Sequence, residues 1–111
     1  MVITLDEYVI TRLPRAAKLI RVVDGDTFWA EVTFEGVQVA INCRMVGINA
    51  PEMSTDEGPI SKAALESMIA HDLELEYLPK REKYGRHLVT VYAHGINLNE
   101  WMVQQNHARL Y

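Results

Sequence analysis

Cysteine, long apolar runs and surplus basic charge are all scarce in this sequence, and each absence excludes a class of protein. A single cysteine among 111 residues cannot form an internal disulfide, and its place in an apolar run predicts that Cys43 is a small buried side chain. No apolar stretch reaches the length that a membrane-spanning helix requires. Asp6 and Glu7 stand where a signal peptide would carry basic and apolar residues, so we expect no signal peptide and a cytoplasmic location.

Motifs for several common cofactors and nucleophiles are also missing. The sequence contains no phosphate-binding loop, no dinucleotide fingerprint and no nucleophile elbow. Its four histidines have no ligand spacing, and with one cysteine they do not predict a zinc site. The histidines are His71, His87, His94 and His107.

The composition that is present describes one globular domain with an acidic balance. Hydrophobic residues make up 49% of the chain, which is enough for one modest core. The 11 basic and 15 acidic residues give a net charge of -4, so tight salt-driven binding to long polyanions is not expected. Such a chain can still hold a few phosphates locally, and it suits a site in which carboxylates surround a cation.

Three consecutive strands are predicted in the first half of the chain. Residues 18–23 and 27–34 are rich in β-forming side chains and flank Asp24-Gly25-Asp26, a strong hairpin signal. A second turn at Glu35-Gly36 leads into a third strand over residues 37–46. Strands joined by such short turns form an antiparallel meander.

The second half of the chain alternates between predicted helices and strands. Pro59 opens a helix whose apolar residues recur at helical spacing as far as residues 70–72. Half-buried strands are predicted over residues 73–78 and 87–93. Asn97 and Glu100 then form a capping pattern that predicts a second helix.

The order of these elements predicts a fold class. A β-β-β-α-β-β-α order describes a mainly β protein with helices (α+β), a small five-stranded closed barrel of the OB-fold type with two helices. We place this barrel domain at residues 17–111. Residues 1–16 precede it as an N-terminal extension, for which an arm and an extra strand are both open.

One stretch joins the third strand to the first helix and carries polar side chains at its tip. The strand delivers Arg44, and the loop after it carries Asn49 and Glu52. A cation and a carboxylate at one loop edge suit a site that holds a phosphate next to a base. The alternative is structural: Arg44 pairs with a neighbouring acid, Pro51 makes a turn and Glu52 is solvated.

Two further clusters supply a pair of carboxylates and a second arginine. Asp24 and Asp26 are two residues apart, and hard cations such as Ca²⁺ bind carboxylate and carbonyl oxygens, although a plain hairpin turn is the alternative. In Lys83-Tyr84-Gly85-Arg86 the arginine suits bidentate phosphate contact and the tyrosine can stack on a base. Here the alternative is a solvated charged loop.

Five separated motifs occur in one order along the chain. They are Val23-Asp24-Gly25-Asp26-Thr27, Arg44…Gly47-Ile48-Asn49-Ala50-Pro51-Glu52, Gly58-Pro59, Lys83-Tyr84-Gly85-Arg86-His87-Leu88-Val89…Tyr92 and Asn97…Asn99-Glu100…Met102-Val103…Ala108. This series resembles the staphylococcal nuclease family, from about residue 18 to residue 111. The resemblance implies an OB-fold barrel with packed helices and Ca²⁺-dependent hydrolysis of DNA and RNA.

The resemblance also implies a cation site. Asp26 aligns with a carboxylate ligand of the family's Ca²⁺, and Asp24 aligns with an acid next to that ligand. Asn49 and the backbone carbonyl of Ala50 align with the second carboxylate ligand and with a carbonyl ligand. Because Asn49 stands where the family usually has Asp, one formal charge is lost, and we expect weaker Ca²⁺ binding.

Catalytic and substrate-binding roles follow from the same alignment. Glu52 aligns with the glutamate proposed to activate the attacking water, and Arg44 and Arg86 align with the arginines that hold the scissile phosphate. The substrate-binding residues that the resemblance implies are Lys83, Tyr84 and Tyr111, the last as a base-stacking aromatic. The expected partner is single-stranded or locally melted DNA or RNA, and no membrane.

Departures from the family pattern favour a second interpretation. The family's C-terminal third helix is not predicted, the chain is acidic, and Asn49 replaces an acid. A catalytically weak or inactive module that binds nucleic acid or protein is therefore the alternative. The sequence leaves open the choice between DNA and RNA, endo- or exo-action, and the oligomeric state.

Overall fold

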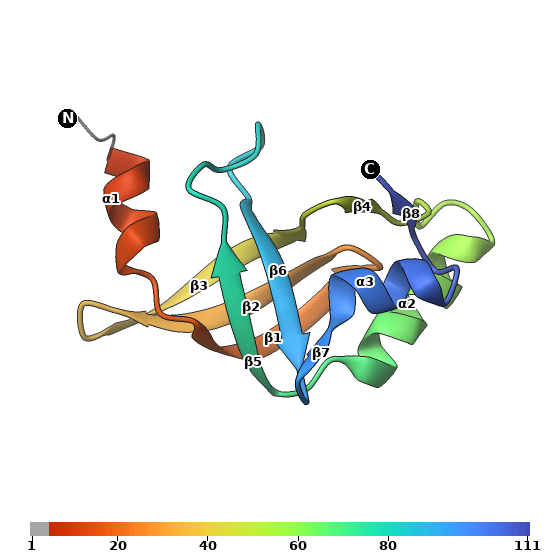
Figure 1. Cartoon of the computed structure of the whole chain (residues 1–111), viewed down its shortest axis with the longest axis horizontal. Helices are drawn as coiled ribbons and strands as arrows, with labels where there is room; N and C mark the ends of the chain where they lie inside the picture. Colours follow the sequence, from red (N-terminus) through yellow and green to blue (C-terminus); the bar gives the residue numbers. More distant parts are fainter. Residues whose placement is uncertain (1–4) are drawn as a thin grey trace.

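A computed structural model of the chain describes residues 5–111, with side chains from Glu7 onward. In chain order, its elements are α1 (Leu5–Arg12), β1 (Ala16–Asp24), β2 (Thr27–Phe34), β3 (Val37–Met45), β4 (Ile48–Asn49), α2 (Glu57–Met68), β5 (Asp72–Tyr77), β6 (His87–Ala93), β7 (Ile96–Asn97), α3 (Leu98–Gln104) and β8 (Arg109–Leu110). The long strands form the centre, α2 and α3 lie together on one side, and α1 stands at the opposite end (Figure 1). None of the helices in this described part is long and apolar enough to cross a membrane.

The barrel is closed by one parallel pair of strands. Antiparallel neighbours run in the order β3-β2-β1-β5-β6, and β3 then pairs in parallel with β6. This pairing sets Cys43 against His87 and Met45 against Val89. The prediction of a mainly β fold with helices, built on a five-stranded barrel of the OB type, is therefore confirmed.

Both predicted hairpins are present. β1 and β2 turn between Asp24 and Thr27, which face each other across the turn. β2 and β3 turn at Glu35 and Gly36, whose φ angles of 50° and 82° are both in the left-handed region. A tight two-residue hairpin of this kind needs positive φ at both central positions, so the second turn follows from its own sequence.

The helices differ from the prediction in number and extent. α2 ends at Met68, before the predicted end at residues 70–72, because Ile69 already has extended angles (φ −73°, ψ 132°). The described residues form three helices rather than two, since Leu5–Arg12 fold as α1. An extra strand is therefore wrong for this part of the extension, and residues 1–4 lie outside the described residues. After α3 the described chain forms β8.

Contacts with two parts of the barrel hold α1 in place. Ile10 is buried, and the Arg12 Nε lies 3.3 Å from the Glu35 Oε1 in the β2–β3 turn. Just after the helix, the Pro14 carbonyl accepts a hydrogen bond from the Tyr77 hydroxyl at 3.1 Å. The extension is thus docked on the barrel near the β2–β3 turn.

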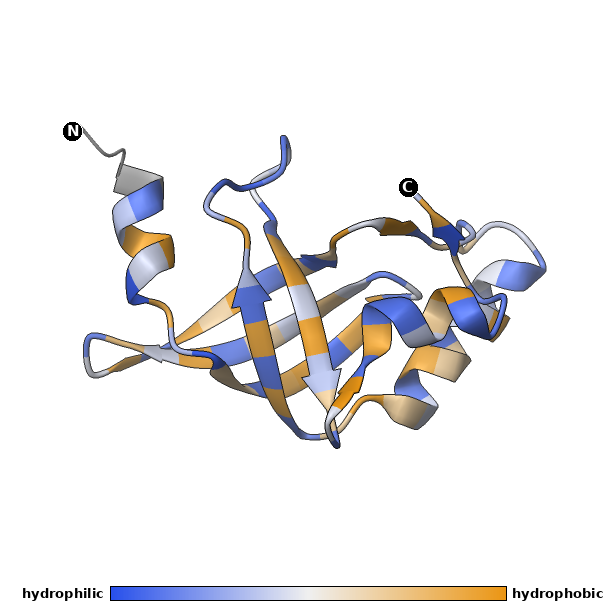
Figure 2. Ribbon diagram, in the orientation of Figure 1, coloured by the Kyte–Doolittle hydropathy of each residue, from blue (hydrophilic) through white to orange (hydrophobic). Residues whose placement is uncertain are grey.

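The core fills the barrel and the space under α2 and α3. Alternate residues of β6 are buried, and apolar and polar residues alternate along the strands in Figure 2. Leu65 of α2 and both Leu98 and Met102 of α3 are fully buried. The two helices therefore close one side of the barrel with their apolar faces.

Asn99 of α3 is a buried polar residue that joins three parts of the fold. Its Oδ1 accepts from the Val91 N–H at 3.0 Å, and its Nδ2 donates to the carbonyls of Val46 and Val89 at 2.9 Å and 3.0 Å. These bonds connect α3 with β6 and with the chain just after β3, beside the seam that closes the barrel. A satisfied buried amide fixes this geometry because unsatisfied partners would be costly.

We predict that Asn99→Ala lowers the free energy of unfolding by about 3 kcal/mol, because it leaves the buried Val91 N–H without its partner and removes a donor from the carbonyls of Val46 and Val89. Asn97→Ala is the matched control. Asn97 caps α3 by accepting from the Glu100 N–H at 3.1 Å, and the loss of such a cap costs about 1 kcal/mol. Chemical denaturation measures both losses, and equal losses would contradict the role given to Asn99.

Candidate functional site

The strand register brings distant side chains to one rim of the barrel. Thr27, at the start of β2, lies opposite Arg44, near the end of β3. The parallel register then places Arg44 opposite Leu88 near the start of β6, so that Arg86, just ahead of β6, reaches the same rim. The three motifs that are separated in sequence therefore meet where the barrel closes.

The Asp26 carboxylate is buried and lies at the centre of this rim. Its Oδ1 accepts from the Thr27 hydroxyl at 2.9 Å, and its Oδ2 accepts from the Ala50 N–H at 2.8 Å. The same Oδ2 lies 3.4 Å from the Arg44 Nη1. Asp26 thus connects the β1–β2 turn with the loop after β4, and it is satisfied on both oxygens as a buried carboxylate must be.

Arg44 bridges the end of its own strand and the loop that follows. Its Nη1 donates to the Met45 carbonyl at 2.9 Å, and its Nη2 donates to the Asn49 Oδ1 at 3.2 Å. Its Cζ lies 5.9 Å from the centre of the Tyr111 ring. The structural alternative for Arg44, pairing with a neighbouring acid, is therefore present in the fold.

Asp24 lies next to Asp26, and its Oδ1 accepts from the Asp26 N–H at 3.0 Å. Burial, and after it the adjacent Asp26 side chain, are the largest causes that raise the pKa of Asp24 from 3.8 to about 6. A cation bound beside these two neighbouring carboxylates would favour the ionised form of Asp24. Asp24 thus contacts the backbone of Asp26, and its place next to a cation ligand stays a prediction.

Arg86 is held by an acid that the sequence analysis did not identify. Its Nε and Nη2 lie 3.1 Å and 3.2 Å from the Oε1 and Oε2 of Glu82, so the pair is bidentate. The hydrogen bond from Arg86 is the main cause that lowers the pKa of Glu82, and the bond to Glu82 raises the pKa of Arg86. The one available sequence signal was an acid four residues before the arginine.

The two arginines belong to one hydrogen-bonded network through Thr27. The Arg86 Nη1 donates to the Thr27 Oγ1 at 3.3 Å, and the Thr27 hydroxyl donates to Asp26. Thr27 is itself buried. The structure therefore brings together six of the residues that the sequence analysis singled out: Asp24, Asp26, Arg44, Asn49, Ala50 and Arg86.

Two exposed tyrosines flank this network. The Tyr84 ring is 74% exposed and lies 6.0 Å from the Arg86 Cζ and 5.0 Å from the Lys83 Nζ. The Tyr111 ring is 88% exposed and lies beside Arg44. Each arginine of the rim thus has one aromatic neighbour that is open to solvent.

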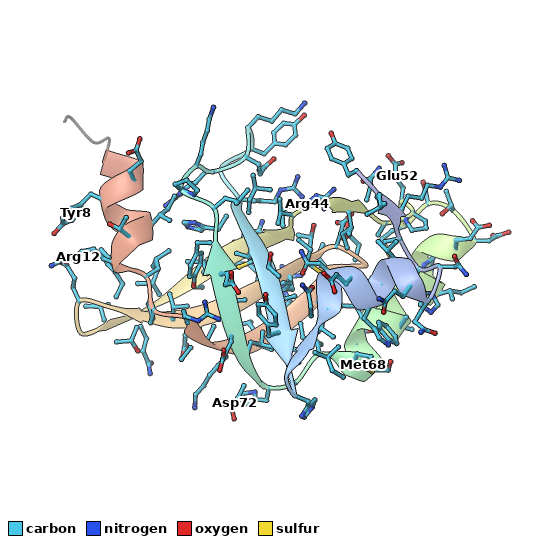
Figure 3. The ribbon with its side chains drawn as sticks, viewed as in Figure 1. Tyr8, Arg12, Arg44, Glu52, Met68 and Asp72 are labelled. Atoms are coloured by element: carbon cyan, nitrogen blue, oxygen red, sulfur yellow. The ribbon has the colours of Figure 1, made fainter. Side chains whose placement is uncertain are left out.

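Glu52 lies outside the hydrogen-bonded network, on the wall of a neighbouring cavity. The cavity has a volume of about 790 Å³ and is lined by the loop from Asn49 to Glu52, by α2 and by the chain before β8. The Glu52 carbonyl accepts from the Thr55 N–H and hydroxyl at 3.0 Å and 2.7 Å, which fixes the base of the loop. Arg44 and Glu52 lie on the same upper side of the molecule in Figure 3.

Two glycines let this loop pack closely, a role that the sequence analysis did not find. A Cβ at Gly25 would lie 1.9 Å from the Ser61 Oγ and 2.8 Å from the Ala50 Cβ. A Cβ at Gly58 would lie 2.1 Å from the Glu52 carbonyl oxygen. Gly25 is therefore required for the contact between the hairpin and α2, and not for a left-handed turn conformation.

The donor set fits a hard cation in its chemistry. Asp26, the Asn49 amide and the Ala50 carbonyl offer only oxygen atoms, which are the ligands that Ca²⁺ prefers. Within residues 5–111, no three His, Cys, Asp or Glu side chains form a cluster that could hold a metal ion. Any cation at this rim would therefore depend on an amide and a backbone carbonyl as well as on carboxylates.

The fold and the rim define the class of this protein: a small OB-type barrel whose closing strands carry two arginines beside a buried carboxylate. A comparison with protein families matches residues 42–111 to the family described as staphylococcal nuclease homologue. The chain belongs to this family, as the order of its motifs predicted.

Several curated proteins are similar to this chain. One from Escherichia coli O157:H7, named "Uncharacterized endonuclease", is 35% identical over 95 residues, which is 85% of this chain and 60% of the relative. A protein of the same name from Escherichia coli has the same identity and coverage. An uncharacterized protein of Methanocaldococcus jannaschii is 27% identical, over 85% of this chain and 58% of the relative. The chain thus spans about 60% of the length of these relatives.

The pair between Arg86 and Glu82 predicts a pH-dependent contribution to stability. The pKa of Glu82 is lowered from 4.5 in the folded protein, so the stabilisation is present above pH 4.5 and is lost as the pH falls below it. We expect Glu82→Gln to lower the melting temperature at neutral pH by about 4 °C, with a difference that shrinks in acid.

Thermal melts of parent and variant across a pH series measure this effect. Glu74→Gln is the matched control, because the Glu74 carboxylate pairs with Arg15 at 3.4 Å on the exposed surface and should contribute little. A Glu82→Gln difference that stays constant below pH 4.5 would contradict the assignment.

Proposed function

We propose that this chain is a Ca²⁺-dependent nuclease that hydrolyses phosphodiester bonds of DNA, of RNA or of both. The observation that carries the proposal is the meeting of Arg44 and Arg86 at one rim, beside the buried Asp26, in a member of the staphylococcal nuclease family. Relatives named "Uncharacterized endonuclease" support it. The proposal concerns the barrel domain at residues 17–111, with residues 1–16 as its extension.

Arg44 and Arg86 are the proposed phosphate-binding residues. A guanidinium binds phosphate oxygens through two parallel N–H donors and keeps its charge at any working pH. Glu82 orients Arg86 at 3.1 Å, so the Arg86 side chain has little freedom left to lose on binding, and Asn49 holds Arg44 at the same rim at 3.2 Å. In hydrolysis the two groups stabilise the charge that builds up on the phosphoryl oxygens.

Asp26, the Asn49 amide oxygen and the Ala50 carbonyl would hold Ca²⁺, with Asp24 behind them. The Asp26 carboxylate is fixed for this role by the Ala50 N–H at 2.8 Å and by the Thr27 hydroxyl at 2.9 Å. A bound Ca²⁺ supplies Lewis-acid stabilisation of the phosphoryl oxygens.

Glu52 is the proposed general base that takes a proton from the attacking water. Its position on the wall of the cavity, next to Ala50, leaves its carboxylate open to solvent water. A general base acts over about 3 Å, so the reactive water would lie between Glu52 and the phosphorus atom. The anchored Glu52 carbonyl restricts the positions that the side chain can reach.

Lys83, Tyr84 and Tyr111 are the proposed substrate contacts beyond the scissile phosphate. The two exposed rings stand beside different arginines, so each can stack on a base next to the phosphate. Lys83 adds a positive charge beside Tyr84 for a further phosphate. Because stacking needs an unpaired base, the proposed substrate is single-stranded or locally melted nucleic acid.

We expect Glu52→Gln to lower kcat on single-stranded DNA in CaCl₂ by roughly 10²- to 10⁴-fold, which is the range for loss of a general base. Glu57→Gln is the matched control, because Glu57 lines the same cavity and has no proposed part in the chemistry. A fluorescence-quench cleavage assay measures both. Full activity in Glu52→Gln, or an equal loss in both variants, would remove Glu52 from this role.

Asn49→Asp should strengthen Ca²⁺ binding about tenfold, because it restores a formal charge to the ligand set. Asn106→Asp is the control, since it adds the same charge to the wall of the cavity that Asn49 also lines, and Asn106 has no proposed part in the ligand set. Isothermal titration with CaCl₂ measures the affinity. Equal gains in the two variants would place Asn49 outside the coordination shell.

A second function is favoured by the pairing of both arginines within the protein. Arg44 is engaged by Asp26 and Asn49, and Arg86 is engaged by Glu82. With a net charge of -4, such a rim could belong to a catalytically weak module that binds nucleic acid or protein. Binding of a single-stranded oligonucleotide without any cleavage in millimolar CaCl₂ would support this alternative over the nuclease.

A further inference from the structure

Arg44 contacts the same oxygen atoms that the cation would need. Its Nη1 lies 3.4 Å from the Asp26 Oδ2, and its Nη2 donates to the Asn49 Oδ1 at 3.2 Å. Nη1 also donates to the Met45 carbonyl at 2.9 Å, which aims the guanidinium at this pair of oxygens. One side chain therefore engages both side-chain members of the ligand set proposed above.

This contact compensates a buried charge. The side chains of Arg44 and Asp26 are only 14% and 8% exposed. A carboxylate in such a place needs a partner, because an unpaired buried charge is strongly destabilising. Asn49 contributes an oxygen but no charge, so the guanidinium does at these oxygens what a bound cation would do.

A guanidinium and a divalent cation would repel each other strongly if they shared these oxygens. Ca²⁺ lies about 2.3–2.6 Å from its ligands, so an ion on the Asp26 Oδ2 would be within a few ångströms of Nη1. The repulsion between two like charges at such a distance is strong near a protein surface, and a divalent ion doubles it. The neutral amide of Asn49 offsets none of that repulsion.

The Tyr111 ring provides a second contact for the Arg44 guanidinium. Its Cζ already lies 5.9 Å from the centre of the exposed Tyr111 ring. The Tyr111 N–H donates to the Gly47 carbonyl at 2.9 Å, which keeps this residue beside the loop. Arg44 can therefore turn away from Asp26 and keep a cation–π contact.

We propose that Arg44 occupies the cation's oxygens in the resting protein, and that cation binding displaces its guanidinium toward the scissile phosphate. This inference rests on the proposed function, because it concerns the same site. Before the cation binds, Arg44 contacts Asp26 and Asn49; after the cation binds, Arg44 contacts the phosphate. By linkage, a phosphate ligand that draws Arg44 away raises the affinity for the cation, and the cation raises the affinity for that ligand by the same factor.

Isothermal titration of CaCl₂ into the protein, without nucleic acid, tests the competition. Arg44→Met keeps the aliphatic stem of the side chain and removes the competing group. Arg86→Met is the matched control, because it removes the same charge from the rim, and the hydrogen bonds of Arg86 go to Glu82 and Thr27. We expect Arg44→Met to bind Ca²⁺ about tenfold more tightly than the parent protein, and Arg86→Met to gain clearly less.

Three results would overturn the inference: equal gains in the two variants, unchanged or weaker binding in Arg44→Met, and no Ca²⁺ binding by either the parent or Arg44→Met. If Arg44→Met does not fold, Arg44→Lys replaces it. A single ammonium group cannot reach both oxygens in the same planar arrangement, so a smaller gain of the same sign is expected. A loss of affinity in Arg44→Lys would equally contradict the competition.

The test of this inference can be separated from the test of the proposed function, because the titration measures Ca²⁺ affinity and not cleavage. Tighter Ca²⁺ binding by Arg44→Met, with no cleavage of single-stranded DNA by the parent protein, would keep the inference and reject the nuclease. Cleavage by the parent, with an unchanged Ca²⁺ affinity in Arg44→Met, would reject the inference alone.

Discussion

The parallel pairing of β3 with β6 is the constraint on which the rest of the structure depends. It closes the barrel, and it also brings Arg44 and Arg86 to one rim, although they belong to different halves of the chain. Thr27 joins the two sides, since its hydroxyl accepts from Arg86 and donates to Asp26. Asn99 braces the same seam from α3 through three hydrogen bonds. Stability and the candidate site therefore depend on the same strand pair.

Charge balance at the rim follows from how deeply its groups are placed. Asp26 is buried and Glu82 is largely covered, so each requires a cation within the fold, and the two arginines provide it. The same pairs hold the guanidinium groups in fixed orientations. A site of this kind is preorganised before any substrate arrives, but its positive charges are already engaged by carboxylates.

The sequence predicts the local parts of this structure well and the non-local parts poorly. The two hairpins and the Asn97 cap depend on residues a few positions apart, and all three are present. The bracing by Asn99 and the close approach of Gly25 to Ser61 depend on packing between distant segments, which no local pattern reports. At the site, residues of three motifs lie at one rim, and their roles belong to the proposal. The acid that holds Arg86 was missed because Glu82 was interpreted as part of a charged loop. The helix α1 was not predicted, because the sequence left an arm and an extra strand both open for residues 1–16.

These features determine how a phosphate could bind to an acidic protein. With a net charge of -4, the chain has no overall positive potential that would attract a polyanion. The affinity for a phosphate must therefore come from local contacts, in which the phosphate replaces a carboxylate as the partner of an arginine. A phosphate presents its oxygens to a guanidinium in the same geometry as a carboxylate, so it can replace Asp26 as the partner of Arg44. Because the Asp26 carboxylate is buried, this replacement requires another cation beside it. The exposed rings of Tyr84 and Tyr111 add stacking of about 1–3 kcal/mol per base, independent of charge. Under the proposed function, a phosphate with an unpaired base on either side would bind better than a free anion. Only such a ligand both replaces Asp26 as the partner of Arg44 and stacks its bases on the tyrosines.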